Sequence, residues 1–261
     1  MKLVFVVGPT ASGKSALALH LAEKFSGAIV NCDSIQIYKR VNIGAAKPST
    51  EDLVRVPHFL YDLVDYPEEI TAGSYRKMFF EKIKELESVF PLVFVVGGTG
   101  FYFQAIEKGM YSVGAADATT KQQVLEELAE PDGPSRLYEE LRSKDPVSAS
   151  RISIRDHYRL GRAIEIIRAH NKTILEIQNE FQDQQKPFPY PLLKLGMNVD
   201  KETLLIQVKD RVKKMLKLGF VSEVKSLLEE VNETWAPMLS VGYKEVVQFL
   251  KNDGIKKELD L

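Results

Sequence analysis

An octapeptide near the start of the chain has the residue types and spacing of a loop that binds phosphate groups. It follows the apolar run 3–7, precedes a helical pattern over 14–25, and reads Gly8-Pro9-Thr10-Ala11-Ser12-Gly13-Lys14-Ser15. Glycine lets backbone N–H groups turn toward an anion, and the helix that follows directs its positive end at the same point. Lys14 adds a point charge, and the Ser15 hydroxyl can reach a magnesium ion. The spacing is that of a P-loop, the kind of loop that binds ATP and other nucleotides, and a plain glycine-rich turn is the less favoured interpretation.

Two further polar segments follow predicted strands. Asp33 follows the apolar run 28–30 after Asn31 and Cys32, and Gly97-Gly98-Thr99-Gly100 follows the apolar run 92–96. Ligands of open parallel sheets bind beyond the carboxyl ends of the strands, so we expect Asp33 to lie beside the P-loop. The alternatives are a helix cap for Asp33, before a helix that starts at Ser34, and a packing turn for the second glycine-rich segment.

The composition places the chain among globular proteins. Of its 261 residues, 44% are apolar and 27% are charged, which suffices for one large core with a smaller lobe. The single cysteine, Cys32, excludes an internal disulfide and fits a reducing cytosol, so we expect a cytoplasmic protein. We find neither an apolar run of membrane-spanning length nor a signal peptide. The net charge of −1 does not itself favour nucleic acid, although a local basic patch could.

The elements that must position the polar segments alternate between strands and helices. We expect an α/β fold of the P-loop NTPase kind, in which a parallel sheet is flanked by helices and carries a small inserted all-helical domain. The predicted domains are a core of residues 1–111 and 190–261 and a helical insertion with its connecting segment at 112–189. Strands are expected at 3–7, 28–30, 58–65, 92–96 and 192–199, and helices at 14–25, 49–54, 75–88, 101–107, 117–130, 135–144, 157–169, 201–218 and 221–231, with a linker or lid at 178–191.

The helix expected at 157–169 has an apolar stripe of Leu160, Ala163, Ile164 and Ile167. Arg155, Arg159 and Arg162 follow another face of this helix. Their spacing favours a solvated face, and the alternative is a track for phosphate groups.

Seven segments together resemble the tRNA dimethylallyltransferases, also called tRNA isopentenyltransferases or the IPP transferase family. The likeness is collinear and covers nearly the whole chain. Only the P-loop is a general motif among the segments, which are 8–15, 33–38 (DSIQIY), 43–48 (IGAAKP), 71–76 (TAGSYR), 96–102 (VGGTGFY), 145–152 (DPVSASRI) and 241–245 (VGYKE).

This resemblance implies a reaction and a set of roles. The family transfers a dimethylallyl group from dimethylallyl diphosphate to N6 of the adenosine on the 3′ side of the anticodon, which gives N6-isopentenyladenosine and diphosphate. The resemblance implies that the P-loop residues bind the diphosphate, with Ser15 on Mg²⁺, and that Asp33 is the general base. Thr99 would bridge base and diphosphate, and Arg211 would brace the departing diphosphate. It also implies that tRNA is bound by a set of eleven residues: Asp33, Ser34, Ile35, Gln36, Thr99, Lys121, Tyr158, Arg159, Leu160, Gly161 and Arg162.

Some features depart from the family pattern. Many relatives carry P-N-D-P-Q-R where this chain reads Ile154-Arg155-Asp156-His157-Tyr158-Arg159, the inserted lobe is shorter than expected, and no basic tail follows. We expect a monomer with tRNA and dimethylallyl diphosphate as partners and no membrane. The rival interpretations are an adenylate prenyltransferase, a P-loop kinase of a small metabolite, and a tRNA-binding module without catalysis.

Overall fold

The computed structural model describes residues 1–109, 118–183 and 187–252. These residues form two compact units, one of Met1–Glu107 with Phe188–Leu261 and one of Lys108–Pro187. The bounds fall within a few residues of the predicted 111/112 and 189/190 boundaries.

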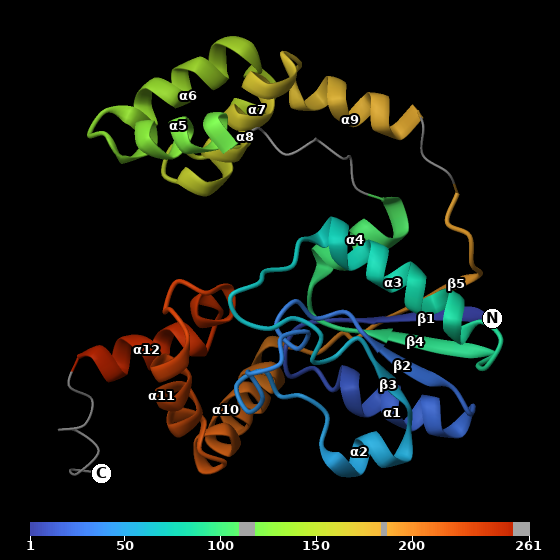
Figure 1. The fold of residues 1–261 in the computed structure, drawn as a ribbon. Coiled ribbons are helices and arrows are strands. Elements are labelled where there is room, and N and C mark those ends of the chain that lie inside the picture. Colours follow the sequence, from blue (N-terminus) through green and yellow to red (C-terminus); the bar gives the residue numbers. More distant parts are fainter. Residues whose placement is uncertain (110–117, 184–186, 253–261) are drawn as a thin grey trace. The chain divides into compact units, whose positions relative to one another are not determined.

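A five-stranded parallel sheet is the centre of the first unit (Figure 1). The strands lie in the order β3-β2-β4-β1-β5, and their bounds are β1 Lys2–Val7, β2 Ala28–Asn31, β3 His58–Phe59, β4 Leu92–Val96 and β5 Leu192–Gly196. Leu3 pairs with both Val93 and Leu192, so β1 is flanked by β4 and β5. The predicted α/β fold with a parallel sheet is confirmed.

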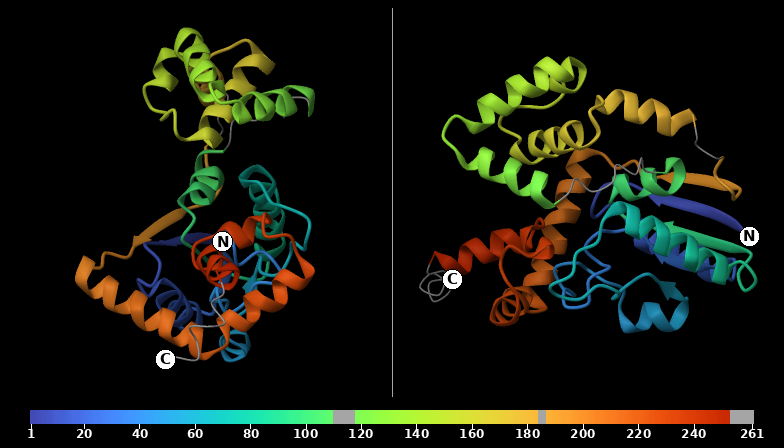
Figure 2. Two further views of the ribbon diagram at one scale, coloured as in Figure 1. Left: turned by 90° about the vertical axis from the view of Figure 1, so that its left-hand side faces the viewer. Right: turned by 45° about the horizontal axis from the view of Figure 1, so that its top comes forward.

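Helices cover both faces of the sheet, as Figures 1 and 2 show. They are α1 (Lys14–Lys24), α2 (Thr50–Arg55), α3 (Ala72–Leu86) and α4 (Gly100–Lys108). Because successive strand residues point to opposite faces, Val4 and Val6 pack with Ala18 of α1, while the Phe5 ring lies 5.0 Å from the Phe103 ring of α4. Apolar side chains on both faces are typical of a buried parallel strand.

The first unit continues after β5 with helices α10 (Lys201–Lys217), α11 (Phe220–Glu230) and α12 (Tyr243–Lys251), and with the short 3₁₀ helix η1 (Ala236–Leu239). Asp200 caps α10, because its carboxylate accepts a hydrogen bond of 2.8 Å from the backbone N–H of Thr203. Gly219, with a φ of 94°, separates α10 from α11.

The described part of the second unit contains helices and no strand. The helices are α5 (Ala118–Ala129), α6 (Gly133–Lys144), α7 (Pro146–Ala149), α8 (His157–His170) and α9 (Ile174–Asp183). The predicted apolar stripe of α8 is confirmed, since Leu160, Ala163, Ile164 and Ile167 are all buried in the core of this unit.

The structure corrects four predictions about local structure. The strand expected at 58–65 ends at Phe59, because Leu60 and Asp62 have φ values of 64° and 55°, which a strand does not accommodate. Helix α3 begins earlier than expected, since Thr71 rather than Ser74 is its N-cap and Ser74 completes the capping box.

The other two corrections concern the second unit. Part of the linker expected at 178–191 is helical, since α9 extends to Asp183. Arg155 precedes α8, which Asp156 caps, so Arg155 does not share a helical face with Arg159 and Arg162. No helix in the described ranges is both long and apolar enough to cross a bilayer.

Candidate active site

The P-loop between β1 and α1 has the backbone that an anion-binding loop requires. Gly13 and Ala11 have φ values of 87° and 64°, and a Cβ on Gly8 would lie only 2.7 Å from the Cβ of Met197. The buried Ser12 hydroxyl has no hydrogen-bond partner among the described residues. Lys14 Nζ donates a hydrogen bond of 2.6 Å to the Pro9 carbonyl, so the ammonium lies against the loop itself. An orphaned hydroxyl and an ammonium held only by a carbonyl are suited to receive phosphate oxygens.

Three neighbouring strands deliver the candidate residues to one edge of the sheet. The P-loop follows β1, Asp33 follows β2, and Thr99 follows β4, which lies between them. The backbone N–H of Cys32 donates to the Val96 carbonyl at 2.7 Å. A Cβ on Gly97 would lie 1.9 Å from the Cys32 carbonyl oxygen, so only glycine permits this approach.

Asp33 begins a turn rather than a helix. Its Oδ1 accepts a hydrogen bond of 2.9 Å from the backbone N–H of Ile35, and residues 34–37 form turns. The Asn31 side chain fixes the preceding backbone, since its Oδ1 accepts from the Asp33 N–H at 2.9 Å and its Nδ2 donates to the Leu60 carbonyl at 2.9 Å. One carboxylate oxygen therefore orders the turn, and Oδ2 lies near the second glycine-rich segment, 3.6 Å from where a Cβ on Gly98 would be.

Asp33, Lys14 and Arg211 lie close enough for their charges to interact. Burial lowers the pKa of Lys14, the nearby Asp33 carboxylate opposes this effect, and Arg211 adds to it. Burial likewise lowers the pKa of Arg211, and Asp33 again opposes it. Two cations in a partly desolvated site with one carboxylate favour the binding of an anion.

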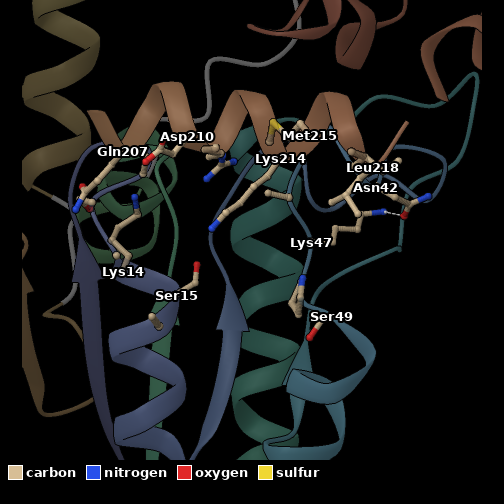
Figure 3. A pocket seen from close by; sticks show the side chains of 18 of the residues that line it. Lys14, Ser15, Asn42, Lys47, Ser49, Gln207, Asp210, Lys214, Met215 and Leu218 are labelled. Atoms are coloured by element: carbon tan, nitrogen blue, oxygen red, sulfur yellow. Dashed lines mark hydrogen bonds between the residues drawn. The ribbon is translucent and has the colours of Figure 1, made fainter. Parts of the chain in front are cut away.

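A cavity of about 910 Å³ extends from the P-loop to α10 and the loop that precedes α2. Figure 3 places Lys14 and Ser15 at one end of this cavity and Leu218 near the other, with Lys214 between them. Its charged lining residues are Lys14, Lys47, Asp62, Asp210, Arg211 and Lys214, and its larger apolar lining residues are Ile43, Pro48, Leu53, Met215 and Leu218. The cavity can therefore hold a ligand with an anionic group and a hydrocarbon group.

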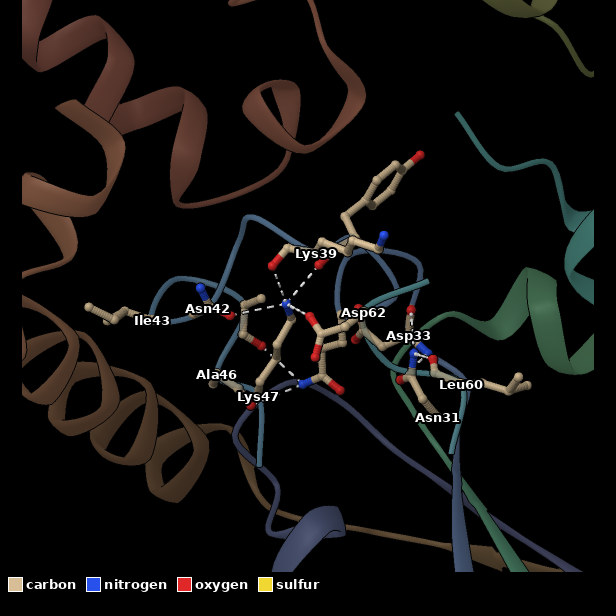
Figure 4. A network of polar contacts seen from close by, with 12 residues as sticks. Asn31, Asp33, Lys39, Asn42, Ile43, Ala46, Lys47, Leu60 and Asp62 are labelled. Atoms are coloured by element: carbon tan, nitrogen blue, oxygen red, sulfur yellow. Dashed lines mark hydrogen bonds and ion pairs between the residues drawn. The ribbon is translucent and has the colours of Figure 1, made fainter. Parts of the chain in front are cut away.

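Lys47 supports the cavity wall. Its ammonium donates to the carbonyl of Tyr38 at 2.7 Å, to Asn42 Oδ1 at 3.1 Å and to the Asp62 carboxylate (Figure 4). Burial lowers the pKa of Lys47, and the hydrogen bond that its ammonium donates to the Asp62 carboxylate opposes this effect. With its donors engaged by the protein, Lys47 has a structural role, whereas Lys214 has no carboxylate within ion-pair distance among the described residues.

The site is compatible with magnesium. Ser15 lines the cavity, and so do the carboxylates of Asp62 and Asp210. The described residues contain no group of three or more His, Cys, Asp or Glu side chains that could enclose a metal ion. This fits Mg²⁺ bound together with a phosphate ligand, because Mg²⁺ usually keeps waters and takes few ligands from the protein.

Thr99 is joined to the turn after Asp33. Its Oγ1 accepts a hydrogen bond from the Ser34 N–H at 3.0 Å and donates to Ser34 Oγ at 3.2 Å. Gln36, in the same turn, donates from Nε2 to the carbonyls of Ala45 and Ala46. The turn 33–36 thus connects the second glycine-rich segment with the cavity wall.

The remaining predicted contact residues belong to the helical unit. Lys121 on α5 is exposed, and so is Tyr158 at the start of α8, with 84% of its surface accessible. Arg159 and Arg162 form ion pairs with Asp156 and Glu165, whereas Leu160 and Gly161 are buried and face the helical core. A hollow of about 250 Å³ is lined by Arg151, Arg159 and Arg162 together with Tyr158.

The sequence reasoning missed several cavity residues. Lys214 lies one helical turn after Arg211 on α10, and this spacing was a usable signal. The apolar spacing of Leu204, Val208, Val212 and Met215 predicts that Val212 points inward. Val212 is instead 46% exposed, since the side of α10 toward the cavity carries Gln207, Arg211 and Lys214. The contribution of Asn42 and Lys47 to the wall had no such signal, because it depends on contacts distant in the sequence.

A parallel sheet, a P-loop at the end of a central strand and a cationic cavity beside it define a protein of the P-loop α/β class. Sequence comparison gives a narrower class: a model of the family described as IPP transferase matches residues 36–260. The tRNA dimethylallyltransferase of Bdellovibrio bacteriovorus is 51% identical over 213 residues, which are 82% of this chain and 69% of that protein. The tRNA dimethylallyltransferase of Geobacter sulfurreducens is 41% identical over 216 residues, which are 82% of this chain and 68% of that protein.

Solved structures agree with these relatives. The tRNA delta(2)-isopentenylpyrophosphate transferase of Staphylococcus epidermidis is 32% identical with a TM-score of 0.63, over 96% of this chain and 81% of that one. A eukaryotic dimethylallyltransferase acting on tRNA is 28% identical with a TM-score of 0.79. The match covers 96% of this chain and 64% of that one. The chain belongs to the IPP transferase family.

Proposed function

We propose that this chain transfers the dimethylallyl group of dimethylallyl diphosphate to N6 of the adenosine on the 3′ side of the tRNA anticodon. Dimethylallyl transfer to tRNA follows from the family and from the relatives. The donor, the acceptor nitrogen and the roles of the residues are the further parts of the proposal. The observation that carries them is the cavity, which has a P-loop at one end and apolar side chains toward the other.

The diphosphate binds at the cationic end of the cavity. The backbone N–H groups of the P-loop, of which Pro9 has none, and the Lys14 ammonium hold its oxygens, and Arg211 from α10 faces it from the other side. Magnesium, bound through Ser15 and the diphosphate, would supply positive charge to the leaving group. Lys14 and Arg211 stabilise the negative charge that develops as the C–O bond to the diphosphate breaks.

Asp33 is the general base. The adenine N6 attacks the allylic carbon, a C–N bond forms, and the electron pair of the C–O bond leaves with the diphosphate. The exocyclic amine is a weak nucleophile because its lone pair is delocalised into the ring, and it improves when Asp33 accepts one of its protons. Thr99, fixed to Ser34, lies on the adjoining turn, where it can position the base or the diphosphate.

The tRNA is the acceptor. The turn Asp33–Gln36 meets the target nucleotide, which must leave its stack to approach the cavity. Lys121, Tyr158, Arg159 and Arg162 of the helical unit contact the remainder of the anticodon stem-loop, through phosphate contacts and through stacking on the exposed Tyr158 ring. The protein is proposed to act as a cytoplasmic monomer.

One labelling experiment tests the reaction and its acceptor. Radiolabelled dimethylallyl diphosphate and magnesium are offered with bulk tRNA, AMP or ATP, and the products are separated. We expect label in tRNA only, recovered after digestion as N6-isopentenyladenosine. Label in AMP or ATP would replace the proposal with a nucleotide prenyltransferase, and no transfer in any mixture would refute it. A phosphate transferred from ATP to a small metabolite would instead identify a kinase.

A further inference from the structure

A carboxylate outside the cavity holds the loop that forms one of its walls. Glu223 lies on α11, and its Oε2 accepts hydrogen bonds from the backbone N–H groups of Asn42 at 3.1 Å and Ile43 at 2.7 Å. Its Oε1 accepts from the Gly44 N–H at 3.1 Å and from the Tyr243 hydroxyl of α12 at 2.6 Å. Three successive backbone donors and one phenol therefore converge on a single side chain.

The packing around Gly44 brings the backbone of this loop close to the helices that carry Glu223 and Tyr243. A Cβ on Gly44 would lie 2.1 Å from the Phe220 ring and 2.6 Å from the Tyr243 ring. These two rings contact each other edge to face, with centroids 5.0 Å apart. Only glycine allows the backbone to approach these rings closely enough for Glu223 to receive all three N–H groups.

The opposite side of the same loop faces the cavity. Asn42, Ile43, Ala46, Lys47 and Pro48 are all lining residues. The segment 41–48 contains turns and no helix or strand, so it lacks the regular backbone hydrogen bonds that would fix it. Its fixed points are Glu223 on the outside, Gln36 at the carbonyls of Ala45 and Ala46, and the Lys47 network. Glu223 also acts on Lys47 through its charge, in the direction that favours the ammonium.

We propose that Glu223, oriented by Tyr243, is a positioning residue that sets the cavity wall 42–48 against the hydrocarbon part of the prenyl donor. This rests on the proposed function, because it takes the ligand to be a diphosphate with a short hydrocarbon chain. Hydrogen bonds to a carboxylate are stronger than neutral ones, and three of them release the wall together when the carboxylate is removed. The P-loop end of the cavity has its own supports and stays intact.

The test is a comparison of Glu223→Ala, Glu223→Gln and the control Glu229→Ala on the same helix. We expect Glu223→Ala to raise the KM for dimethylallyl diphosphate by about tenfold, the size expected for the loss of bonds to a charged group, while kcat and the KM for tRNA change little. Glu223→Gln keeps one oxygen acceptor and should be intermediate, and Glu229→Ala should match the parent. The affinity for pyrophosphate with magnesium should be unchanged in all three.

Two outcomes with Glu223→Ala overturn the proposal. One is a donor KM within twofold of the parental value in folded Glu223→Ala, and the other is an equal loss of affinity for pyrophosphate, which would indicate general damage. If Glu223→Ala does not fold, Tyr243→Phe removes one hydrogen bond and keeps the ring. We expect this variant to raise the donor KM a few-fold. An unchanged donor KM in both Tyr243→Phe and Glu223→Gln would then refute the positioning role of Glu223. A parental protein that transfers no label refutes the proposed function instead, so the two failures are distinct.

Discussion

Thr99 accepts a hydrogen bond from the backbone N–H of Ser34 at 3.0 Å, across 65 residues of sequence. This bond joins the turn after β4 to the turn after β2, and the second of these turns carries Asp33. The Asp33 carboxylate is held by its own bond to the Ile35 N–H, and the turn that carries it is tied through Ser34 to Thr99. The proposed role of Asp33 as general base requires a carboxylate held in one orientation, and this pair of turns supplies such a restraint.

Lys14→Ala and Ser15→Ala should each abolish tight binding of diphosphate while the fold stays intact. The hydrogen bond of Lys14 Nζ is to the P-loop carbonyl of Pro9, and the side chain lines the cavity rather than the apolar core, so its removal leaves the core packing unchanged. Loss of one contact to the charged diphosphate, from the Lys14 ammonium or the Ser15 hydroxyl, weakens binding by roughly 10- to 100-fold. Calorimetry with pyrophosphate and magnesium measures the change, and Lys24→Ala on the exposed face of α1 is the control. Parental affinity in both variants would refute the assignment.

Arg159→Ala and Arg162→Ala should each weaken tRNA binding and flatten its salt dependence. Each lost phosphate contact lowers the slope of log affinity against log salt by at most about one. Both arginines already pair with carboxylates three residues away, at 3.0 Å and 2.8 Å, so a contact to tRNA must compete with these pairs. We therefore expect effects below the maximum.

Arg142→Ala is the matched control for the two arginine variants. Arg142 is an exposed arginine of the same unit that also pairs with a carboxylate three residues away, Glu139. If all three variants change the salt slope equally, the effect is one of net charge. If neither Arg159→Ala nor Arg162→Ala changes the salt slope, these two arginines are merely exposed to solvent and do not contact tRNA.

The sheet and the P-loop could be predicted because their signals are local. The apolar runs 3–7 and 92–96 coincide closely with β1 and β4, and the spacing of Gly8, Gly13 and Lys14 is sufficient to identify the loop. The positive φ value at Leu60 has no such signal, since leucine rarely adopts it, and a single Asp62 is too weak a signal to end a strand. The strand expected at 58–65 was too long for that reason.

The cavity wall could not be predicted from local patterns. The loop at Ile43 takes its position from Glu223, 180 residues later, and from aromatic rings on two C-terminal helices. The IGAAKP segment was recognised as a family motif, but nothing in its composition indicates that Lys47 is a structural side chain. Its role follows from carbonyls at Tyr38 and Lys39 that only the fold brings together.

Arg168→Met should destabilise the helical unit by about 1–3 kcal/mol, because Arg168 joins three helices through bonds to charged groups. Its guanidinium donates to both carboxylate oxygens of Glu127 on α5, at 2.7 Å and 2.9 Å, and to both oxygens of Glu140 on α6. Hydrogen exchange of the amides in α5, α6 and α8 measures the local free energy of unfolding. Arg142→Met is the control with the same change of charge.

The contribution of Arg168 to the stability of the helical unit should also depend on pH. The hydrogen bonds from Arg168 lower the pKa of Glu127 and of Glu140 below the ordinary value of 4.5. A carboxylate with a lowered pKa stabilises the folded state above its unfolded pKa, and this stabilisation is lost as the pH falls through the folded pKa. The parent should therefore lose more stability than Arg168→Met below pH 4.5. Equal acid sensitivity in the two proteins would show that the pairs contribute nothing measurable.

The last prediction concerns Asp33. Asp33→Asn keeps an oxygen that can accept from the Ile35 N–H, so the turn 33–36 is preserved while the base is removed. Loss of general-base catalysis should lower kcat by about 10²–10⁴ with saturating tRNA. Donor affinity should change little, since Lys14, Arg211 and the P-loop remain. Single-turnover transfer of radiolabelled dimethylallyl groups measures the rate, and calorimetry with pyrophosphate and magnesium measures binding. Near-parental turnover would end the assignment of Asp33 as base, and a defect confined to binding would make it a magnesium ligand.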